Sequence, residues 1–203
     1  MTTATQSAAP SAASHWRRLR TLYLLIAVCL APVIASYLAY YVFPPDGRTN
    51  YGQLIVPQRP TPTLSLRQED GAPYDLQRLR GSWVMLTVDA AACAEPCRTL
   101  LWQMRQLRTM QGKDADRIER VFLMTDAAPL EAGLLQEYQG THFLRADRDE
   151  IARFLPAGEG TRLEDHVFLI DPIGNLMLRW PKDADPSRMK RDLGKLLKAS
   201  RIG

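Results

Sequence analysis

The feature that most constrains this chain is the segment from Thr21 to Phe43, which contains no charged side chain. As an α-helix rising 1.5 Å per residue, the segment would span roughly 34 Å, enough to cross the hydrocarbon core of a bilayer. A cleavable signal peptide typically has an apolar core of only about 7–15 residues, so an uncleaved anchor is the favoured interpretation. The sequence therefore predicts a single transmembrane helix over residues 21–43.

The residues before this segment set its expected orientation. Arg17, Arg18 and Arg20 precede the span, and no acidic residue occurs before it. Basic residues are retained on the cytoplasmic side of a membrane. We therefore expect residues 1–20 to form a disordered cytoplasmic tail and the C-terminal part to be exported. No Arg-rich amphipathic presequence is apparent, which favours a bacterial inner membrane with a periplasmic domain.

The exported part begins with a stretch rich in proline and glycine, residues 44–62. Proline excludes regular helix and favours extended chain, so this stretch is predicted to be a linker. Residues 63–203 then have the length of one domain. The net charge of +4 is small, and no basic stripe interleaved with aromatic residues appears, so nucleic-acid binding is not expected.

Apolar runs and helical periodicity alternate through residues 63–203. Such alternation predicts an α/β domain in which helices flank a mixed central sheet, as in the thioredoxin-like fold. The segment 142–144 is expected to be an edge strand, and the last two strands a hairpin. Strands are expected at 64–66, 83–88, 121–124, 142–144, 166–170 and 176–180, and helices at 75–79, 97–107, 130–138, 149–155 and 185–197.

Two cysteines stand at the junction between the buried strand 83–88 and the following helix. Cys93 and Cys97 are separated by three residues, and Pro96 favours a helix start beside Cys97. Helix N-terminal N–H groups and Arg98 both favour a thiolate there. The pair is suited to disulfide exchange or to holding a soft metal such as Cu(I) or Zn(II). A purely structural disulfide is the weaker alternative, because a small loop gains little from closure.

A metal site would need a further ligand, for which histidine is the first candidate. Of the three histidines, His15 precedes the membrane span and His142 lies at a short strand. His166 begins the strand before Asp171, where a thioredoxin-like fold would place it opposite the cysteine loop. It is either a third ligand, oriented by Asp165, or a hydrogen-bonded histidine at a strand end. The remaining cysteine, Cys29, lies in the membrane segment as a small apolar side chain.

The chain resembles the Sco/SenC family, the membrane-anchored thioredoxin-like copper proteins of cytochrome c oxidase assembly, over roughly residues 62–202. The resemblance rests on the anchor, the segment Leu-Arg-Gly-Ser-Trp-Val at 79–84, Cys93-x-x-x-Cys97, the Val-Phe-Leu-Met-Thr-Asp segment at 121–126, and Asp165-His166 leading into Asp-Pro-x-Gly-Asn at 171–175. The loop before Cys93 lacks the family's usual Gly-Tyr-Thr, and His166 stands about three residues closer to the Asp-Pro turn. These departures mark a divergent member.

The resemblance implies that Cys93, Cys97 and His166 bind copper and that the protein assists the copper site of cytochrome c oxidase subunit II. Two other functions remain open at this stage. One is an exported thiol-disulfide oxidoreductase without stable metal binding, in which Cys93 and Cys97 form the catalytic redox pair. The other is a non-catalytic assembly factor that acts by docking.

Overall fold

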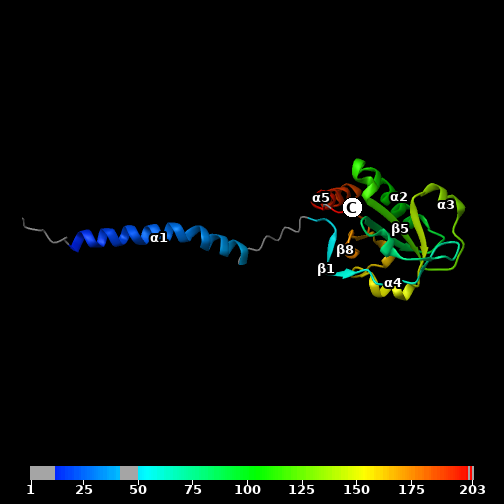
Figure 1. Ribbon diagram of the computed structural model, residues 1–203, viewed down its shortest axis with the longest axis horizontal. Helices are drawn as coiled ribbons and strands as arrows, with labels where there is room; N and C mark the ends of the chain where they lie inside the picture. The colour runs from blue at the N-terminus through cyan, green and yellow to red at the C-terminus, as the bar shows by residue number, and fades with distance from the viewer. Residues whose placement is uncertain (1–11, 42–49, 201, 203) are drawn as a thin grey trace, which may run out of the picture. The chain divides into compact units, whose positions relative to one another are not determined.

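The structure, a computed structural model, describes residues 12–41, 50–200 and 202. The chain divides into two compact units, residues 1–48 and 49–203. In the first unit, helix α1 runs from Ala12 to Tyr41 (Figure 1). Its segment Leu19–Ala39 is long and apolar enough to cross a membrane.

The extent of α1 corrects the predicted N-terminal boundaries. Residues 12–20 are helical, not part of a disordered tail, because nothing between Ala12 and the apolar segment breaks a helix. The rest of the predicted tail, residues 1–11, lies outside the described residues, as do positions 42 and 43 of the predicted span. Pro32 lies inside the helix, which is tolerated in membrane segments.

The second unit is built on one eight-stranded sheet with the order β1-β8-β7-β4-β5-β6-β2-β3. The strand β4 pairs in parallel with β5, and β5 with β6, whereas the other pairs are antiparallel. This mixed sheet confirms the predicted architecture. The strands are β1 (Gln53–Pro60), β2 (Leu66–Arg67), β3 (Pro73–Tyr74), β4 (Trp83–Asp89), β5 (Ile118–Met124), β6 (Thr141–Arg145), β7 (Phe168–Ile170) and β8 (Asn175–Arg179).

Helices cover both faces of the sheet, as the sequence predicts (Figure 1). On one face, Met85 of β4 packs with apolar side chains of α2 and α5, while the next residue, Leu86, packs on the other face with α4. This alternation follows from the two-residue period of a strand. The helices are α2 (Glu95–Thr109), α3 (Ala132–Glu137), α4 (Arg148–Phe154) and α5 (Pro186–Ala199), with 3-10 turns η1 (Leu76–Leu79), η2 (Gly112–Arg117) and η3 (Leu163–Asp165).

The predicted linker 44–62 is partly a strand, so the domain begins before residue 63. Residues 53–60 form β1, which pairs with β8 at the edge of the sheet, and residues 44–49 lie outside the described part. An edge strand tolerates proline because one side of it needs no ladder N–H. The carboxylate of Asp192 on α5 holds the start of this segment, accepting hydrogen bonds from the backbone N–H groups of Tyr51 (3.0 Å) and Gly52 (2.7 Å).

The prediction that residues 142–144 form an edge strand is wrong. The strand β6 pairs with β5 on one side and with β2 on the other, where Arg67 lies opposite Arg145. The two-residue strands β2 and β3 are too short to show a period-2 pattern in the sequence. They nevertheless close this side of the sheet.

Candidate functional site

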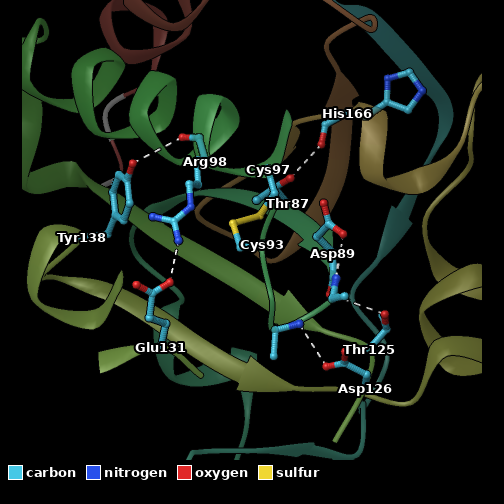
Figure 2. The surroundings of a disulfide bond; sticks show 12 residues. Thr87, Asp89, Cys93, Cys97, Arg98, Thr125, Asp126, Glu131, Tyr138 and His166 are labelled. Carbon is cyan, nitrogen blue, oxygen red and sulfur yellow. Dashed lines mark hydrogen bonds and ion pairs between the residues drawn. A yellow bond between two sulfur atoms is a disulfide. The ribbon is translucent and has the colours of Figure 1, made fainter. Parts of the chain in front are cut away.

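The two cysteines of residues 49–203 form a disulfide in the loop between β4 and α2 (Figure 2). The Cα atoms of Cys93 and Cys97 are 5.1 Å apart. The loop begins at the carboxyl end of β4, next to the carboxyl end of its parallel neighbour β5. In open α/β sheets this edge is where functional sites are usually found.

The backbone explains how the loop brings the sulfurs together. Cys97 is the third residue of α2, after Pro96, as the sequence predicts. Cys93 closes a turn through a 3.0 Å hydrogen bond from its N–H to the carbonyl of Ala90, and its φ of 38° lies in the left-handed region. The side chain of the N-cap residue Ala94 makes no hydrogen bond to the free N–H groups at the start of α2.

Both cysteines are buried, each with 1% of its surface exposed. They belong to an apolar cluster that contains Leu101 of α2, Phe122 and Met124 of β5, and Leu134 of α3. The loop residues around them, by contrast, are exposed and mostly small: Ala92, Ala94, Glu95 and Pro96. A reacting partner therefore has to approach the disulfide from the side of this loop.

Asp126, a residue for which the sequence predicted no role at the site, fixes the cysteine loop from the neighbouring strand end. Its Oδ1 accepts a 3.0 Å hydrogen bond from the N–H of Ala91, which is fully buried. The N–H of Thr125 bonds to the carbonyl of Asp89 at 3.0 Å, which holds the ends of β4 and β5 together. The signal was present in the sequence, since polar residues that directly follow two adjacent parallel strands meet at one edge of the sheet.

Asp89 ends β4 and is also close to the site (Figure 2). Burial raises the pKa of this carboxyl most, and the nearby carboxylate of Glu164 raises it further. The N–H of Ala90, which donates to Oδ1 of Asp89 at 2.7 Å, acts in the opposite direction, as do Arg162 and Arg148. The result is that the neutral form of this carboxyl, beside the cysteine loop, is favoured more than usual.

Arg98, which follows Cys97, connects the cysteine helix to the segment around α3. Its guanidinium pairs with Glu131 at 2.5 Å, and its carbonyl accepts a hydrogen bond from the hydroxyl of Tyr138 at 3.4 Å (Figure 2). Burial raises the pKa of Tyr138, with a smaller contribution from Glu137, so the phenol stays protonated. The positive charge predicted beside Cys97 is thus present, but it is shared with Glu131.

The structure places His166 apart from the cysteines, with its ring directed away from the disulfide (Figure 2). His166 is 2% exposed, and both of its ring nitrogens are hydrogen-bonded. Nδ1 lies 2.8 Å from the carbonyl of Trp180 and must donate to it, whereas Nε2 accepts from the hydroxyl of Thr161 at 2.7 Å. Burial lowers the pKa of His166, so the neutral ring is favoured. This is the hydrogen-bonded strand-end histidine that the sequence left open.

The alternation of side chains along the chain explains this placement. The backbone of His166 is close to β4, since its carbonyl accepts a 3.2 Å hydrogen bond from the hydroxyl of Thr87. The next residue, Val167, packs in the same apolar cluster as Met104 of α2. Neighbouring residues in extended chain point to opposite sides, so the ring of His166 faces away from α2.

These contacts do not fit a three-ligand metal site made of Cys93, Cys97 and His166. Within the described ranges, no three side chains of His, Cys, Asp or Glu come together in a way that could hold a metal ion. His142 is committed elsewhere, because its ring bonds to Glu119 at 3.2 Å and to the hydroxyl of Tyr74 at 3.3 Å. The structure thus brings the two predicted sulfur ligands together and leaves the histidine on another side of the sheet.

Comparisons with known proteins agree with this fold. A family model described as "transmembrane-like, thioredoxin-like, C-terminal domain" matches residues 83–200. The chain belongs to this family. The matched segment begins with β4 and includes the disulfide, all four helices of the domain and the final hairpin. No curated protein matches the sequence significantly.

Solved structures of Sco proteins are similar to this chain, which confirms the resemblance at the level of fold. The copper-bound crystal structure of Arabidopsis thaliana ScoI is 18% identical, with a TM-score of 0.55, and the match covers 68% of this chain and 98% of that one. Copper-bound yeast Sco1 is 19% identical, with a TM-score of 0.54 and coverage of 71% and 95%. A thiol:disulfide interchange protein of the thioredoxin family from Chlorobium tepidum is 19% identical, with a TM-score of 0.52 and coverage of 70% and 99%.

Proposed function

We propose that this protein is a membrane-anchored, Sco-like thiol-disulfide oxidoreductase that acts on cysteines of another exported protein. The observation that carries the proposal is the disulfide between Cys93 and Cys97, placed at the start of α2 at the carboxyl edge of the sheet. Helix N-termini stabilise thiolates, which are both the nucleophiles and the leaving groups of disulfide exchange. The likeness to a thiol:disulfide interchange protein supports the same chemistry.

The exchange needs no group beyond the two proteins. A thiolate of the partner attacks one sulfur of the disulfide, the bond between Cys93 and Cys97 breaks, and the other sulfur leaves as a thiolate. We assign the leaving thiolate to Cys97, because it lies in the first turn of α2 and precedes Arg98. A second partner thiolate then attacks the mixed disulfide at the partner's own sulfur. The partner becomes oxidised by two electrons, and this protein is released with both cysteines reduced.

A redox titration of the full chain in detergent tests this proposal. We expect Cys93 and Cys97 to equilibrate with a glutathione buffer as one two-electron couple and to exchange with a peptide disulfide. Cys93→Ser and Cys97→Ser should each abolish the two-electron couple. Cys29→Ser, which removes the thiol of the membrane segment, is the matched control and should leave it unchanged. Failure of the wild-type pair to exchange with the peptide would sink the proposal.

Copper binding is the second candidate function. It is favoured by two thiols held with their Cα atoms 5.1 Å apart, and by the copper-bound structures of similar fold. Two thiolates alone suit Cu(I). Copper stoichiometry of the reduced full chain, measured for wild type, Cys93→Ser and His166→Ala, decides the matter. Near one equivalent in wild type, lost in Cys93→Ser and lost in His166→Ala, would favour the three-ligand site despite the present position of the ring.

The proposed setting is the bacterial inner membrane, with α1 as the anchor, the N-terminus in the cytoplasm and the domain in the periplasm. The proposed partner, implied by the resemblance to Sco proteins, is cytochrome c oxidase subunit II. Because a cysteine has to be a thiolate to ligate copper, the exchange with this partner would run in the reverse direction, from reduced Cys93 and Cys97 to a disulfide of the partner. Under the copper alternative, the protein would assist assembly of the partner's copper site directly. If oxidase assembly survives replacement of both Cys93 and Cys97 by serine, the role is docking alone.

A further inference from the structure

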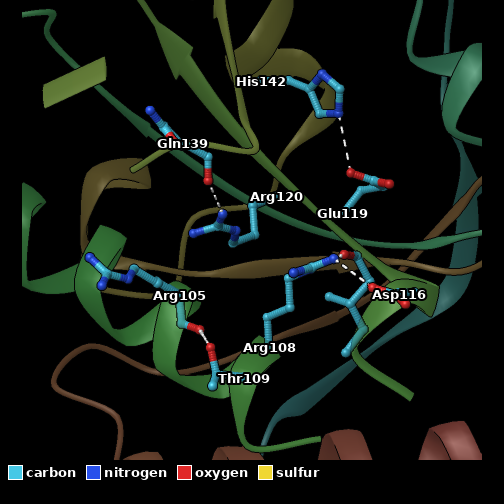
Figure 3. A network of polar contacts seen from close by, with 9 residues as sticks. Arg105, Arg108, Thr109, Asp116, Glu119, Arg120, Gln139 and His142 are labelled. Atoms are coloured by element: carbon cyan, nitrogen blue, oxygen red, sulfur yellow. Dashed lines mark hydrogen bonds and ion pairs between the residues drawn. The ribbon is translucent and has the colours of Figure 1, made fainter. Parts of the chain in front are cut away.

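A buried arginine on β5 lacks the counter-charge that such a residue normally has. Arg120 is only 5% exposed, and the single hydrogen bond of its side chain in the described structure runs from Nη2 to the carbonyl of Gln139, at 2.6 Å (Figure 3). Its Nε and Nη1 are buried, and neither has a hydrogen-bond partner among the described residues. An arginine side chain stays charged in proteins, so these donors carry positive charge out of water without compensation.

The nearest other charges make the imbalance larger. Burial lowers the pKa of Arg120 most, followed by the positive charges of Arg108 and Arg105 on α2; only Glu119 acts in the opposite direction. Glu119 points to the other face of the sheet, because neighbouring residues of a strand alternate, and its carboxylate bonds to His142 at 3.2 Å. On the α2 side, Arg108 pairs with the exposed Asp116 at 3.2 Å.

Two further arginines, Arg105 and Arg108 of α2, lie close enough to Arg120 for their positive charges to act on it. Figure 3 shows its guanidinium between Arg105 and Arg108 on one side and the carbonyl of Gln139 on the other, with one free nitrogen directed toward the side of Arg105. Arg105 is exposed and bonds only a backbone carbonyl, that of Glu137, at 3.1 Å. At Gly140, with a φ of +77°, a Cβ atom would lie 3.3 Å from Nη2 of Arg120, so a larger residue there would crowd the guanidinium.

We propose that Arg120, together with Arg105 and Arg108, binds a small oxyanion of the phosphate class. Phosphate offers several acceptor oxygens and more than one negative charge, which suits a buried guanidinium with unpaired donors and two further arginines nearby. Arg120 supplies the buried donors and Arg105 closes over the anion from the helix surface. This site lies on the β5 and α2 segments away from the disulfide loop, so the proposal is independent of the thiol chemistry proposed above.

Titration calorimetry of the full chain in a neutral detergent tests the site. The probe is sodium phosphate, with sodium chloride at matched ionic strength as the reference. We expect saturable binding of one phosphate and none of chloride. Arg120→Gln should weaken the affinity roughly ten-fold or more, because charged hydrogen bonds are lost from a buried position. Arg105→Gln should weaken it by a smaller factor, and Arg153→Gln, an exposed arginine on α4, should leave it unchanged.

The remaining outcomes are also decisive. If Arg120→Gln does not fold, the test is the phosphate affinity of Arg105→Gln compared with that of Arg153→Gln. Glycerol 3-phosphate as a second probe separates the sources. Binding of both probes shows that the site accepts a phosphate monoester, such as the headgroup of phosphatidate, and binding of phosphate alone assigns it to the free ion. An absence of saturable phosphate binding in wild type, or equal affinity in wild type and Arg105→Gln, would overturn the proposal.

Discussion

The disulfide and His166 both lie beside β4, yet their surroundings are opposite in kind. The sulfurs of Cys93 and Cys97 are packed among apolar side chains under a loop of small exposed residues. The ring of His166 is buried in a polar pocket where both nitrogens have partners. Under the proposed function, the sulfurs change their covalent state, whereas both nitrogens of the His166 ring already have partners within the fold. The comparison therefore predicts that substitutions beside the sulfurs change the redox chemistry and that substitution of His166 changes the stability of the fold.

The largest effect that separates the two regions is expected from His166→Ala. It leaves a cavity and removes the ring's donor to the buried carbonyl of Trp180, which should lower the free energy of unfolding by about 2–5 kcal/mol. The reduction potential of the disulfide should stay the same. Urea unfolding with the disulfide intact measures the first quantity, and His142→Ala, at a part-exposed ring, is the control with a smaller loss. If His166→Ala shifted the reduction potential of the disulfide and left the free energy of unfolding unchanged, His166 would act on the sulfurs and not on the stability of the fold.

Asp126→Ala should have the next largest effect, and it acts on the disulfide side. The variant leaves the buried N–H of Ala91 without its acceptor, which costs about 1–3 kcal/mol. Because this bond fixes the cysteine loop, we also expect faster reduction of the disulfide by a small thiol. Asp126→Asn keeps an acceptor oxygen and serves as the conservative control. Equal reduction rates in wild type and Asp126→Ala would show that the loop holds its position without this bond.

The pH dependence of stability should come partly from the His166 side. The folded pKa of His166 is lowered from 6.5, so the unfolded chain binds the proton more readily. Its contribution to stability is therefore complete above pH 6.5 and is lost as the pH falls below that value, at no more than about 1.4 kcal/mol per pH unit. Urea unfolding between pH 8 and pH 5 should show a shallower loss for His166→Phe than for wild type. If the free energy of unfolding fell equally with pH in both proteins, the pH dependence would not come from His166.

The smallest effect is expected at the ion pair between Arg98 and Glu131. Their side chains are 34% and 61% exposed, so solvent screens the pair, and Glu131→Gln should change the free energy of unfolding by less than about 1 kcal/mol. The same change frees the guanidinium of Arg98 beside Cys97, which should stabilise the thiolate and raise the reduction potential slightly. A potential that falls instead would mean that Arg98 does not act on the sulfurs.

Elements with a strong pattern could be predicted from the sequence. The buried run of β4, the helical stripe of α2 and the Asp185-Pro186 start of α5 all lie where the pattern indicates. The strand β1 could not be predicted, because its prolines disfavour a strand locally and its pairing partner β8 is distant in the sequence. The orientation of His166 could not be read from spacing alone, since a shift of one residue in extended chain reverses the side to which a ring points.

The site was predicted in part, and the contacts that were missed join residues far apart in the sequence. Cys93 and Cys97 were found because their spacing and the helix start are local features. Asp126 acts across two strands, and the position of the ring of His166 depends on Thr161 and the carbonyl of Trp180. Contacts of this kind depend on which strands are neighbours, and a single sequence states this only indirectly.

The left-handed backbone at Cys93 makes the two cysteines unequal as positions in the chain. Cys97 lies in regular helix, where alanine or serine fits without backbone strain, whereas a side chain at position 93 has to adopt a φ of 38°. Glycine accepts that conformation freely, and other residues resist it by roughly 1–2 kcal/mol. Cys93→Gly would therefore remove the thiol with the least distortion of the turn. For an engineer who wants a scaffold free of thiols, glycine at 93 with alanine at 97 is the pair of replacements that the backbone itself specifies.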